Sequence, residues 1–232
     1  MTSTRTLGLA IAAALALGSS VALGASPGSV AHLSGTLSVK KPDGSVRILA
    51  QKSEIQNGDT LSTERDSYAQ VRFTDGGLVT MRPSTTVKIE NVNFAEDKPK
   101  EDSFLYGLLK GGLRAVTGIV GKRSQERYQV SAATATIGIR GTTLQAETDC
   151  KGPAGEAGVC VSVHDGEVAV ITPEGERRAK AGEALMAVAG KAPFTIPFDS
   201  VLQWTPPATF LMSLGRGAAV SKDKLECVVR AK

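Results

Sequence analysis

The residues of this chain best suited to covalent chemistry are its three cysteines, Cys150, Cys160 and Cys227. Cys150 and Cys160 stand at the two ends of a glycine-rich connection, 151–159, and stretches with strand-like alternation flank it. A hairpin there brings the two sulfurs together, and an oxidising compartment then favours a disulfide between them. Two unlinked thiols are the alternative. Cys227 is the odd cysteine, and the sequence leaves open whether it is buried, free or bonded to a second chain.

Acid–base chemistry has only His32 and His164 to draw on as histidine bases. His164 directly precedes Asp165, and neighbouring strand residues point to opposite faces, so the two side chains do not form a base with its orienting acid. We expect His164 to be a polar, outward-facing residue at a hairpin turn. The histidines lie far apart in the sequence and leave no set of metal ligands. These residues therefore predict no catalytic residue, metal or cofactor, and the alternative is a hydrolase whose catalytic carboxylates are brought together only by folding.

Phosphate chemistry is excluded by spacing. Residues 118–124 read Gly-Ile-Val-Gly-Lys-Arg-Ser, which resembles part of a phosphate-binding loop. That loop needs a glycine where this chain has Val116, and a serine or threonine where it has Arg123. The formal net charge of +4 is also too small to imply nucleic acid as a partner.

Arg140 is the charged residue whose surroundings are most unusual, since Ile137, Ile139 and Gly141 surround it. A guanidinium there can tie several backbone carbonyls at a strand corner. Gly141 permits a positive φ or a close backbone approach, and the Thr142 hydroxyl can bond the corner locally. We expect a structural corner at Arg140, Gly141 and Thr142, and the alternative is that Arg140 recognises a carboxylate or a strand of a partner.

Five cations fall between Phe104 and Tyr128, against the single acid Glu126. If they share one sheet face, they form a surface for anionic glycans, lipid headgroups or an acidic protein. An ordinary solvated face is the alternative. This possible basic contact face consists of Lys110, Arg114, Lys122, Arg123 and Arg127.

The elements that must position these residues are strands, because apolar and polar residues alternate with a period of two. Turns are expected at 40–45, 75–77, 83–85, 121–124, 165–166 and 173–175, and bends in a strand at 104–118. Residues 93–103 are dense in charge and predict a solvated excursion. The predicted strands are 36–39, 46–49, 69–73, 79–81, 87–89, 159–163, 168–170 and 183–188, with another around Leu144 and Ala146.

The two ends of the chain have different compositions. Arg5 precedes an apolar stretch, 7–23, and small residues follow it, which is typical of a signal peptide cleaved near Gly24. An uncleaved membrane anchor is the alternative. Prolines punctuate the C-terminal end, and 207–214 is expected to form a short helix. We expect its aromatic residues to pack this tail onto the domain, the alternative being a binding patch, and they are Phe194, Phe198, Trp204 and Phe210.

The order of the turns around the Arg-Gly-Thr corner resembles that of the FecR domain of bacterial envelope proteins. The resemblance covers roughly 27–188, and no membrane span is expected once the signal is removed. The motifs that carry it are Asn-Gly-Asp-Thr-Leu at 57–61, Ala-Gln-Val-Arg-Phe-Thr-Asp-Gly at 69–76, Met-Arg-Pro-Ser-Thr at 81–85, Ala-Thr-Ile-Gly-Ile-Arg-Gly-Thr at 135–142 and Asp-Gly-Glu-Val-Ala-Val at 165–170.

This resemblance implies an all-β periplasmic domain without enzymatic activity. The best-known members carry a cytoplasmic anti-sigma segment and one membrane helix ahead of this domain, which receives a signal from an outer-membrane transporter. No such segment precedes the predicted signal peptide here, so we expect a stand-alone exported protein. Its partner would be an envelope protein or a cell-wall glycan, and the alternative is a sensing component that contacts a separate membrane regulator or transporter.

The predicted organisation is a signal peptide at 1–24, a FecR-like β domain at 27–190 and a C-terminal extension at 191–232. The fold class is all-β. Its twisted antiparallel sheets form either a sandwich or a short coiled stack.

Overall fold

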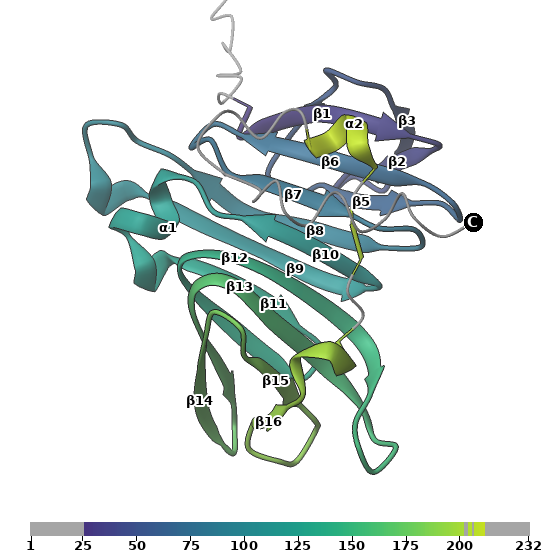
Figure 1. The fold of residues 1–232 in the computed structure, drawn as a ribbon. Coiled ribbons are helices and arrows are strands. Elements are labelled where there is room, and N and C mark those ends of the chain that lie inside the picture. The colour runs from purple at the N-terminus through teal and green to yellow at the C-terminus, as the bar shows by residue number, and fades with distance from the viewer. Residues whose placement is uncertain (1–25, 202–203, 206, 212–232) are drawn as a thin grey trace, which may run out of the picture.

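The chain folds as an all-β structure, as its alternating sequence predicts. The computed structural model describes residues 26–201, 204–205 and 207–211 (Figure 1). Their strands join into one continuous sheet, and this sheet curls into two facing layers. The predicted signal peptide at 1–24 and Cys227 lie outside the described residues.

One layer follows the strand order β3-β2-β5-β8-β9-β11, and within it the β9–β11 pair is parallel. Alternation decides which face is buried. Val87 and Ile89 point into the core while Lys88 and Glu90 are exposed. The strands are β2 (Leu37–Lys40), β3 (Val46–Leu49), β5 (Thr60–Thr63), β8 (Thr86–Asn93), β9 (Ser103–Lys110) and β11 (Tyr128–Ala132).

The second layer follows the order β4-β1-β6-β7-β10, with antiparallel pairing throughout. The predicted bend within 104–118 occurs at Gly111, where the chain leaves the first layer at the end of β9 and enters the second at β10. The strands are β1 (Gly28–Ser34), β4 (Glu54–Ile55), β6 (Tyr68–Phe73), β7 (Leu78–Met81) and β10 (Gly112–Val116).

A long bent strand, β12 (Ala135–Lys151), joins the two layers on one side. Its first half pairs with β11 of the first layer, and its second half pairs with β10 of the second. Its other edge pairs with β13 (Ala157–Thr172), which continues to β14 (Gly175–Lys180) and β15 (Ala184–Ala187), and β16 (Phe194–Ile196) extends β15. The two layers are therefore joined along β12 and enclose the core between them.

The hairpin predicted at Asp165-Gly166 is wrong, because β13 runs through these residues without reversing. Gly166 (φ +79°) and Gly141 (φ +59°) lie opposite each other, where the pairing of β12 with β13 shifts register. A Cβ on Gly166 would lie 2.4 Å from the Gly141 carbonyl oxygen, so this bulge requires glycine. An Asp-Gly pair serves a turn or a bulge equally well, and here it bends the strand.

Buried aromatic side chains fill the centre of the core. Phe104 stacks on Tyr128 at a centroid distance of 4.3 Å, and Phe73 meets the Phe104 ring edge-on at 4.7 Å. Tyr106 meets both Phe104 and Tyr128 edge-on. Burial raises the pKa of both tyrosine hydroxyls far above the usual value. This cluster draws on β6, β9 and β11, so it holds the two layers together.

The helices are short and lie at strand ends. They are η1 (Pro99–Glu101), α1 (Ile119–Arg123), η2 (Gln125–Arg127), η3 (Phe198–Ser200) and α2 (Ala208–Leu211). The predicted turn at 121–124 is thus wrong in its first residues, which belong to α1. The predicted helix at 207–214 begins as α2, and its last residues lie outside the described chain. Among the described residues, no helix is long and apolar enough to cross a membrane.

Candidate functional site

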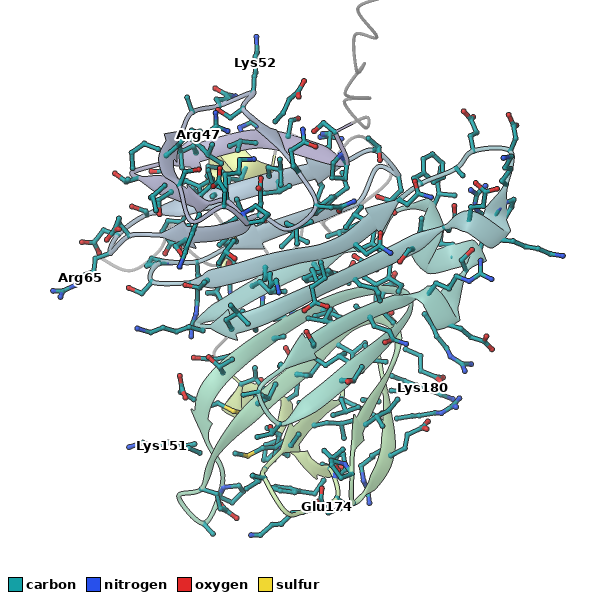
Figure 2. All side chains as sticks on the ribbon, turned by 180° about the vertical axis from the view of Figure 1, so that it is seen from behind. Arg47, Lys52, Arg65, Lys151, Glu174 and Lys180 are labelled. Carbon is teal, nitrogen blue, oxygen red and sulfur yellow. A yellow bond between two sulfur atoms is a disulfide. The ribbon has the colours of Figure 1, made fainter. Side chains whose placement is uncertain are left out.

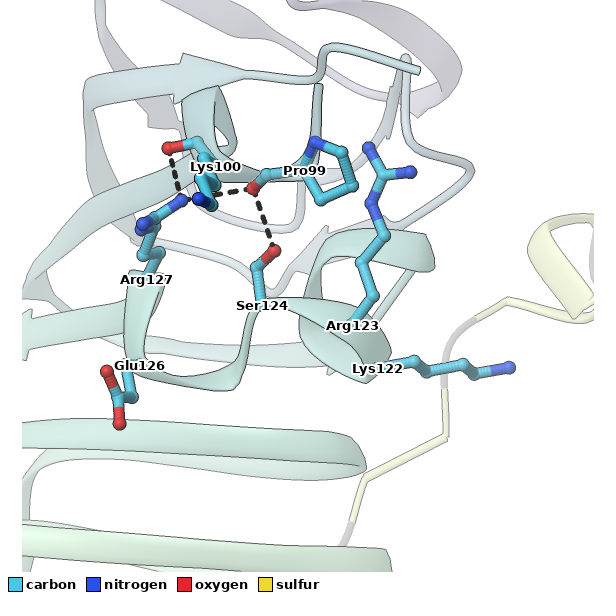
Figure 3. A pocket seen from close by; sticks show the side chains of 7 residues that line it. All are labelled: Pro99, Lys100, Lys122, Arg123, Ser124, Glu126 and Arg127. Carbon is cyan, nitrogen blue, oxygen red and sulfur yellow. Dashed lines mark hydrogen bonds between the residues drawn. The ribbon is translucent and has the colours of Figure 1, made fainter. Parts of the chain in front are cut away.

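A cleft opens where the chain leaves β10 and returns toward β11 (Figure 3). Helices α1 and η2 form one wall and η1 forms the other, and the cleft has a volume of about 440 Å³. Four of its seven lining residues are cationic and one is acidic, so it attracts anions. The lining residues are Pro99, Lys100, Lys122, Arg123, Ser124, Glu126 and Arg127.

Asp75 holds α1 at this position. Its backbone carbonyl accepts the Ile119 N–H at 3.0 Å, and its carboxylate accepts the N–H groups of Gly77 and Val120 at 2.9 and 3.4 Å. Burial raises the pKa of Asp75 above its usual value. A Cβ on Gly118 would lie 2.3 Å from the Asp75 carbonyl oxygen, so the approach requires a glycine. The Asp-Gly-Gly turn therefore positions the cleft as well as joining β6 to β7.

The Arg123 side chain joins the two walls of the cleft through hydrogen bonds to residues that flank η1. Its Nε and Nη2 donate to the Asp102 carboxylate at 2.8 and 3.0 Å, and the fork also donates to the carbonyls of Ala95 and Glu96. Its guanidinium lies 4.9 Å from the Phe94 ring centroid. The hydrogen bonds from Arg123 hold the pKa of Asp102 below its usual value. Residues 96–101 are exposed, as expected of a solvated excursion at 93–103, but Asp102 within this stretch is buried.

Arg127 and Ser124 also join the two walls. Arg127 donates to the carbonyls of Pro99 and Lys100, and the Ser124 hydroxyl donates to Pro99 at 3.2 Å and to Asp102 at 3.0 Å. Figure 3 shows these bonds converging on Pro99 while the Lys122 side chain points away from them. Within the part of the chain that the structure describes, the ammonium groups of Lys100 and Lys122 have no partner. They are the cations of the cleft that remain available to a ligand.

The basic contact face predicted from sequence is divided among three places. Lys122, Arg123 and Arg127 line the cleft. Lys110 ends β9 at the far end of β10 from α1, and Arg114 lies on the outer face of the second layer. The five cations therefore do not share one sheet face.

The Arg140 corner is a strand bulge at the place where β12 passes from one layer to the other. The Thr142 N–H donates to Thr117 Oγ1 at 2.8 Å, and its hydroxyl donates to the Glu167 carbonyl at 2.7 Å. Arg140 itself is exposed and forms no side-chain hydrogen bond or ion pair with the described residues. The expected hydrogen bonds from Arg140 to backbone carbonyls are absent among the described residues. Its side chain borders a groove lined in part by Glu126, Glu176 and Arg178.

The disulfide expected between Cys150 and Cys160 is present, with a Cα–Cα distance of 6.1 Å. It fastens the far ends of β12 and β13. The two sulfurs pack into a small apolar cluster beneath the start of the tail, and its other members are Ala184, Met186, Val188, Phe194, Ile196, Phe198 and Val201.

His164 is partly buried, and the expectation that it faces outward at a hairpin is wrong. Its ring meets Phe198 of the tail edge-on at 5.4 Å, and its Nε2 is buried without a hydrogen-bond partner among the described residues. Burial, together with the charge of Arg114, lowers the pKa of His164 to about 4. Within the described chain, no group of three or more His, Cys, Asp or Glu residues is placed to hold a metal ion.

We expect acid to destabilise the wild-type protein through His164. The pKa of His164 in the fold lies below the unfolded value of 6.5, so the unfolded state takes up the proton first. The contribution of neutral His164 to the free energy of unfolding is full above pH 6.5 and decreases as the pH falls toward 4. The expected loss between pH 7 and pH 5 is about 1–2 kcal/mol in urea denaturation, since the ring is only partly buried.

His164→Gln should remove this part of the pH dependence, while the matched variant His32→Gln should retain it. Equal slopes of unfolding free energy against pH in the wild type and in His164→Gln would contradict the assignment.

The side of the sandwich opposite β12 is open. The layers end there in β3 and in the two-residue strand β4, and residues of both strands line a groove of about 310 Å³. Val46 and Ile48 on β3 are 64% and 68% exposed. Figure 2 shows Lys52 projecting from the loop after β3, at the opposite end of the molecule from Glu174. Among the described residues, β3 therefore pairs only with β2, and its other edge is open beside apolar side chains in solvent.

These features define an all-β domain of two sheet layers, closed on one side by a long bent strand and open on the other. Residues 59–169 match the model of the family described as FecR protein. They therefore form a FecR-family domain, in agreement with the resemblance seen in the sequence.

Other comparisons are more distant. No curated protein matches the chain. Two crystal structures of a "putative anti-sigma factor" from Parabacteroides distasonis ATCC 8503 are similar at 18% and 16% sequence identity, with TM-scores of 0.45 and 0.46. Each match covers 60% of this chain and 59% of the other, so the chain spans little more than half the length of these relatives.

Proposed function

We propose that this protein is a signalling module of the bacterial cell envelope that works in the periplasm by binding another envelope protein, without catalysis. The FecR-family match at 59–169 supports a regulatory role. The Cys150–Cys160 disulfide supports an oxidising compartment such as the periplasm. A transporter or a membrane regulator as the partner would make this chain the sensing component of a relay.

The observation that carries the proposal is the exposed edge of β3. An edge strand presents unpaired backbone donors and acceptors, and proteins usually protect such edges with charges, proline or a covering segment. Here Val46 and Ile48 remain in solvent beside the groove that separates β3 from β4. A strand from a partner added to β3 pairs with its backbone and covers both apolar side chains.

A second candidate ligand is an anionic glycan bound in the cationic cleft. Lys100 and Lys122 favour it, because their ammonium groups face solvent beside a wall whose arginines are already occupied. Lysine contacts of this kind are weak singly and depend on salt.

The test is a pull-down from chemically crosslinked envelopes with the full-length chain, followed by mass spectrometry. The edge variant Val46→Lys/Ile48→Lys should lower recovery of the principal envelope protein at least tenfold, because two buried charges prevent strand addition. The cleft variant Lys100→Ala/Lys122→Ala should leave that protein bound.

The matched control is Ile171→Lys, which places a lysine at another exposed apolar strand residue. Equal recovery with the edge variant and with this control would rule out β3 as the contact. Loss of cell-wall fragments with the cleft variant alone would select the glycan candidate.

A further inference from the structure

A row of polar side chains crosses the outer face of the second layer. In β6, β7, β10 and β12 the neighbours of each row member along the strand point into the core, so the row itself faces away from the core. The pairing register places each member directly opposite the next, across six adjacent strands. This polar row consists of His32 (β1), Gln70 (β6), Thr80 (β7), Arg114 (β10), Gln145 (β12) and Ser162 (β13).

The row is buried although it lies outside the core. Gln145 is 3% exposed and Ser162 is fully buried. Gln70 donates to Thr80 at 3.0 Å, and the Gln145 amide donates to the Trp204 carbonyl at 3.1 Å. The Gln145 carbonyl oxygen and the Ser162 hydroxyl have no hydrogen-bond partner among the described residues. Buried polar atoms normally find partners, so this face is incompletely satisfied.

Arg114 is the charged member of the row and lacks a counter-charge. Within the described chain its guanidinium forms no hydrogen bond, ion pair or ring contact, and burial lowers its pKa. The acid that follows Gln145 on the same face, Glu147, is bound to Arg82. The charge of Arg114 acts on His164, which is also basic. A partly buried guanidinium without an anion is costly, and a carboxylate matches its fork.

The C-terminal tail covers this row. We define the strap as 197–201, 204–205 and 207–211, which crosses the strands of the second layer (Figure 1). Every third residue of the strap is at least partly buried. The other strap residues whose burial is described are exposed. The inward residues are Phe198, Val201, Trp204, Pro207 and Phe210.

Aromatic contacts attach the strap along its length. Phe198 meets His164, the Trp204 ring lies 6.1 Å from Tyr68, and Phe210 stacks on His32 at 5.4 Å. These contacts confirm that the aromatic residues of the tail pack on its own domain. Arg114, on β10, lies between the strand that bonds the Trp204 carbonyl, β12, and the strand that Phe210 contacts, β1.

We infer that the polar row is a binding face for an extended, acidic peptide segment of a partner protein, which displaces the strap and places a carboxylate on Arg114. The strap demonstrates that a peptide segment with short helices at its two ends, η3 and α2, fits across these strands with every third side chain turned inward. Asp199, the acid within the strap, is exposed and lies at the β13 end, away from Arg114. Pro207 is the inward residue between Trp204 and Phe210, so a partner segment with a carboxylate there brings the missing charge to the stretch of the row that contains Arg114.

This inference goes beyond the proposed function, because the polar row lies on the outer face of the second layer and includes no residue of β3. Its test requires no envelope, so either idea can fail without the other. Trp204 is the only tryptophan of the chain, and its emission therefore reports whether the strap stays in place.

The probes are synthetic peptides that copy residues 197–211 with Trp204→Phe, so that they contribute no tryptophan fluorescence. One carries Pro207→Glu and its matched control carries Pro207→Gln. Added to the full-length chain, the Glu peptide should shift Trp204 emission to longer wavelength and bind at least tenfold more tightly than the Gln peptide. Arg114→Gln should abolish this preference while leaving binding of the Gln peptide unchanged. Acetate should leave the Trp204 emission unchanged, since it cannot replace the aromatic contacts of the strap.

The inference is overturned if the two peptides bind equally, if the preference survives in Arg114→Gln, or if neither peptide at millimolar concentration shifts the emission. If Arg114→Gln fails to fold, as judged by circular dichroism, the inference is tested by how the wild type's preference for the Glu peptide depends on salt. The preference for the Glu peptide should weaken at least threefold between 0.05 and 0.5 M salt if it rests on a charge pair, as Debye screening requires. A preference independent of salt would reject Arg114 as the anchor.

Discussion

Arg123→Met is expected to lower the free energy of unfolding by about 3 kcal/mol, because it leaves a buried carboxylate without its partner. The Asp102 side chain has no exposed surface, and Arg123 supplies two of its hydrogen bonds. The Arg123 side chain is 25% exposed, so we place the loss at the lower end of the range for buried pairs. Urea denaturation at pH 7 measures this difference in the free energy of unfolding.

Acid should narrow the difference between this variant and the wild type. The pKa of Asp102 in the fold lies below the usual 3.8, so the stability contributed by the pair is present above that pH and decreases as the pH falls further. Adding Asp102→Asn to Arg123→Met should recover part of the loss, because the orphaned charge is then removed.

Lys122→Met is the matched control, since it removes the neighbouring cation, which has no partner among the described residues. It should change stability by no more than about 0.5 kcal/mol. If Lys122→Met and Arg123→Met lose the same amount, the ion pair is not what holds η1 against α1.

Cys150→Ser is expected to lower the free energy of unfolding by about 2–3 kcal/mol under oxidising conditions, because it opens a short covalent loop. The two cysteines are ten positions apart, and the bond holds the ends of β12 and β13 next to Gln145 and Ser162. With reductant present, the wild type should fall to the stability of the variant.

Thermal unfolding followed by circular dichroism, with and without dithiothreitol, provides the measurement. Cys150→Ser/Cys160→Ala serves as a second variant without a free thiol at this site. A loss of the same size in reduced and oxidised protein would mean that packing around the sulfurs, rather than the bond, carries the effect.

The cleft illustrates how far sequence reasoning reaches. It identified Lys122, Arg123 and Arg127 as neighbouring cations, because they are close in the chain. It did not identify Asp102 as their buried partner, because residues 93–103 are dense in charge and such a stretch is usually solvated. The bond between Arg123 and Asp102 spans 21 positions, and the approach of η1 to α1 decides it.

The β12–β13 pair shows a second limit. Asp165-Gly166 has the composition of a hairpin turn, and the same two residues instead form a bulge opposite Gly141. Local sequence supplies the positive φ in both cases. Only the pairing partner, a long strand that already crosses between the layers, determines whether the chain reverses or bends.

The sequence by itself predicted the all-β class, the strands β2, β3, β6, β7, β8 and β15 and the Cys150–Cys160 disulfide, because alternation, turn residues and short loop closure are local properties. Only the tertiary structure aligned Gln70, Arg114 and Gln145 in one row and laid the strap across it. Strand register and strap docking depend on contacts between residues far apart in the chain, and packing of the two layers selects them.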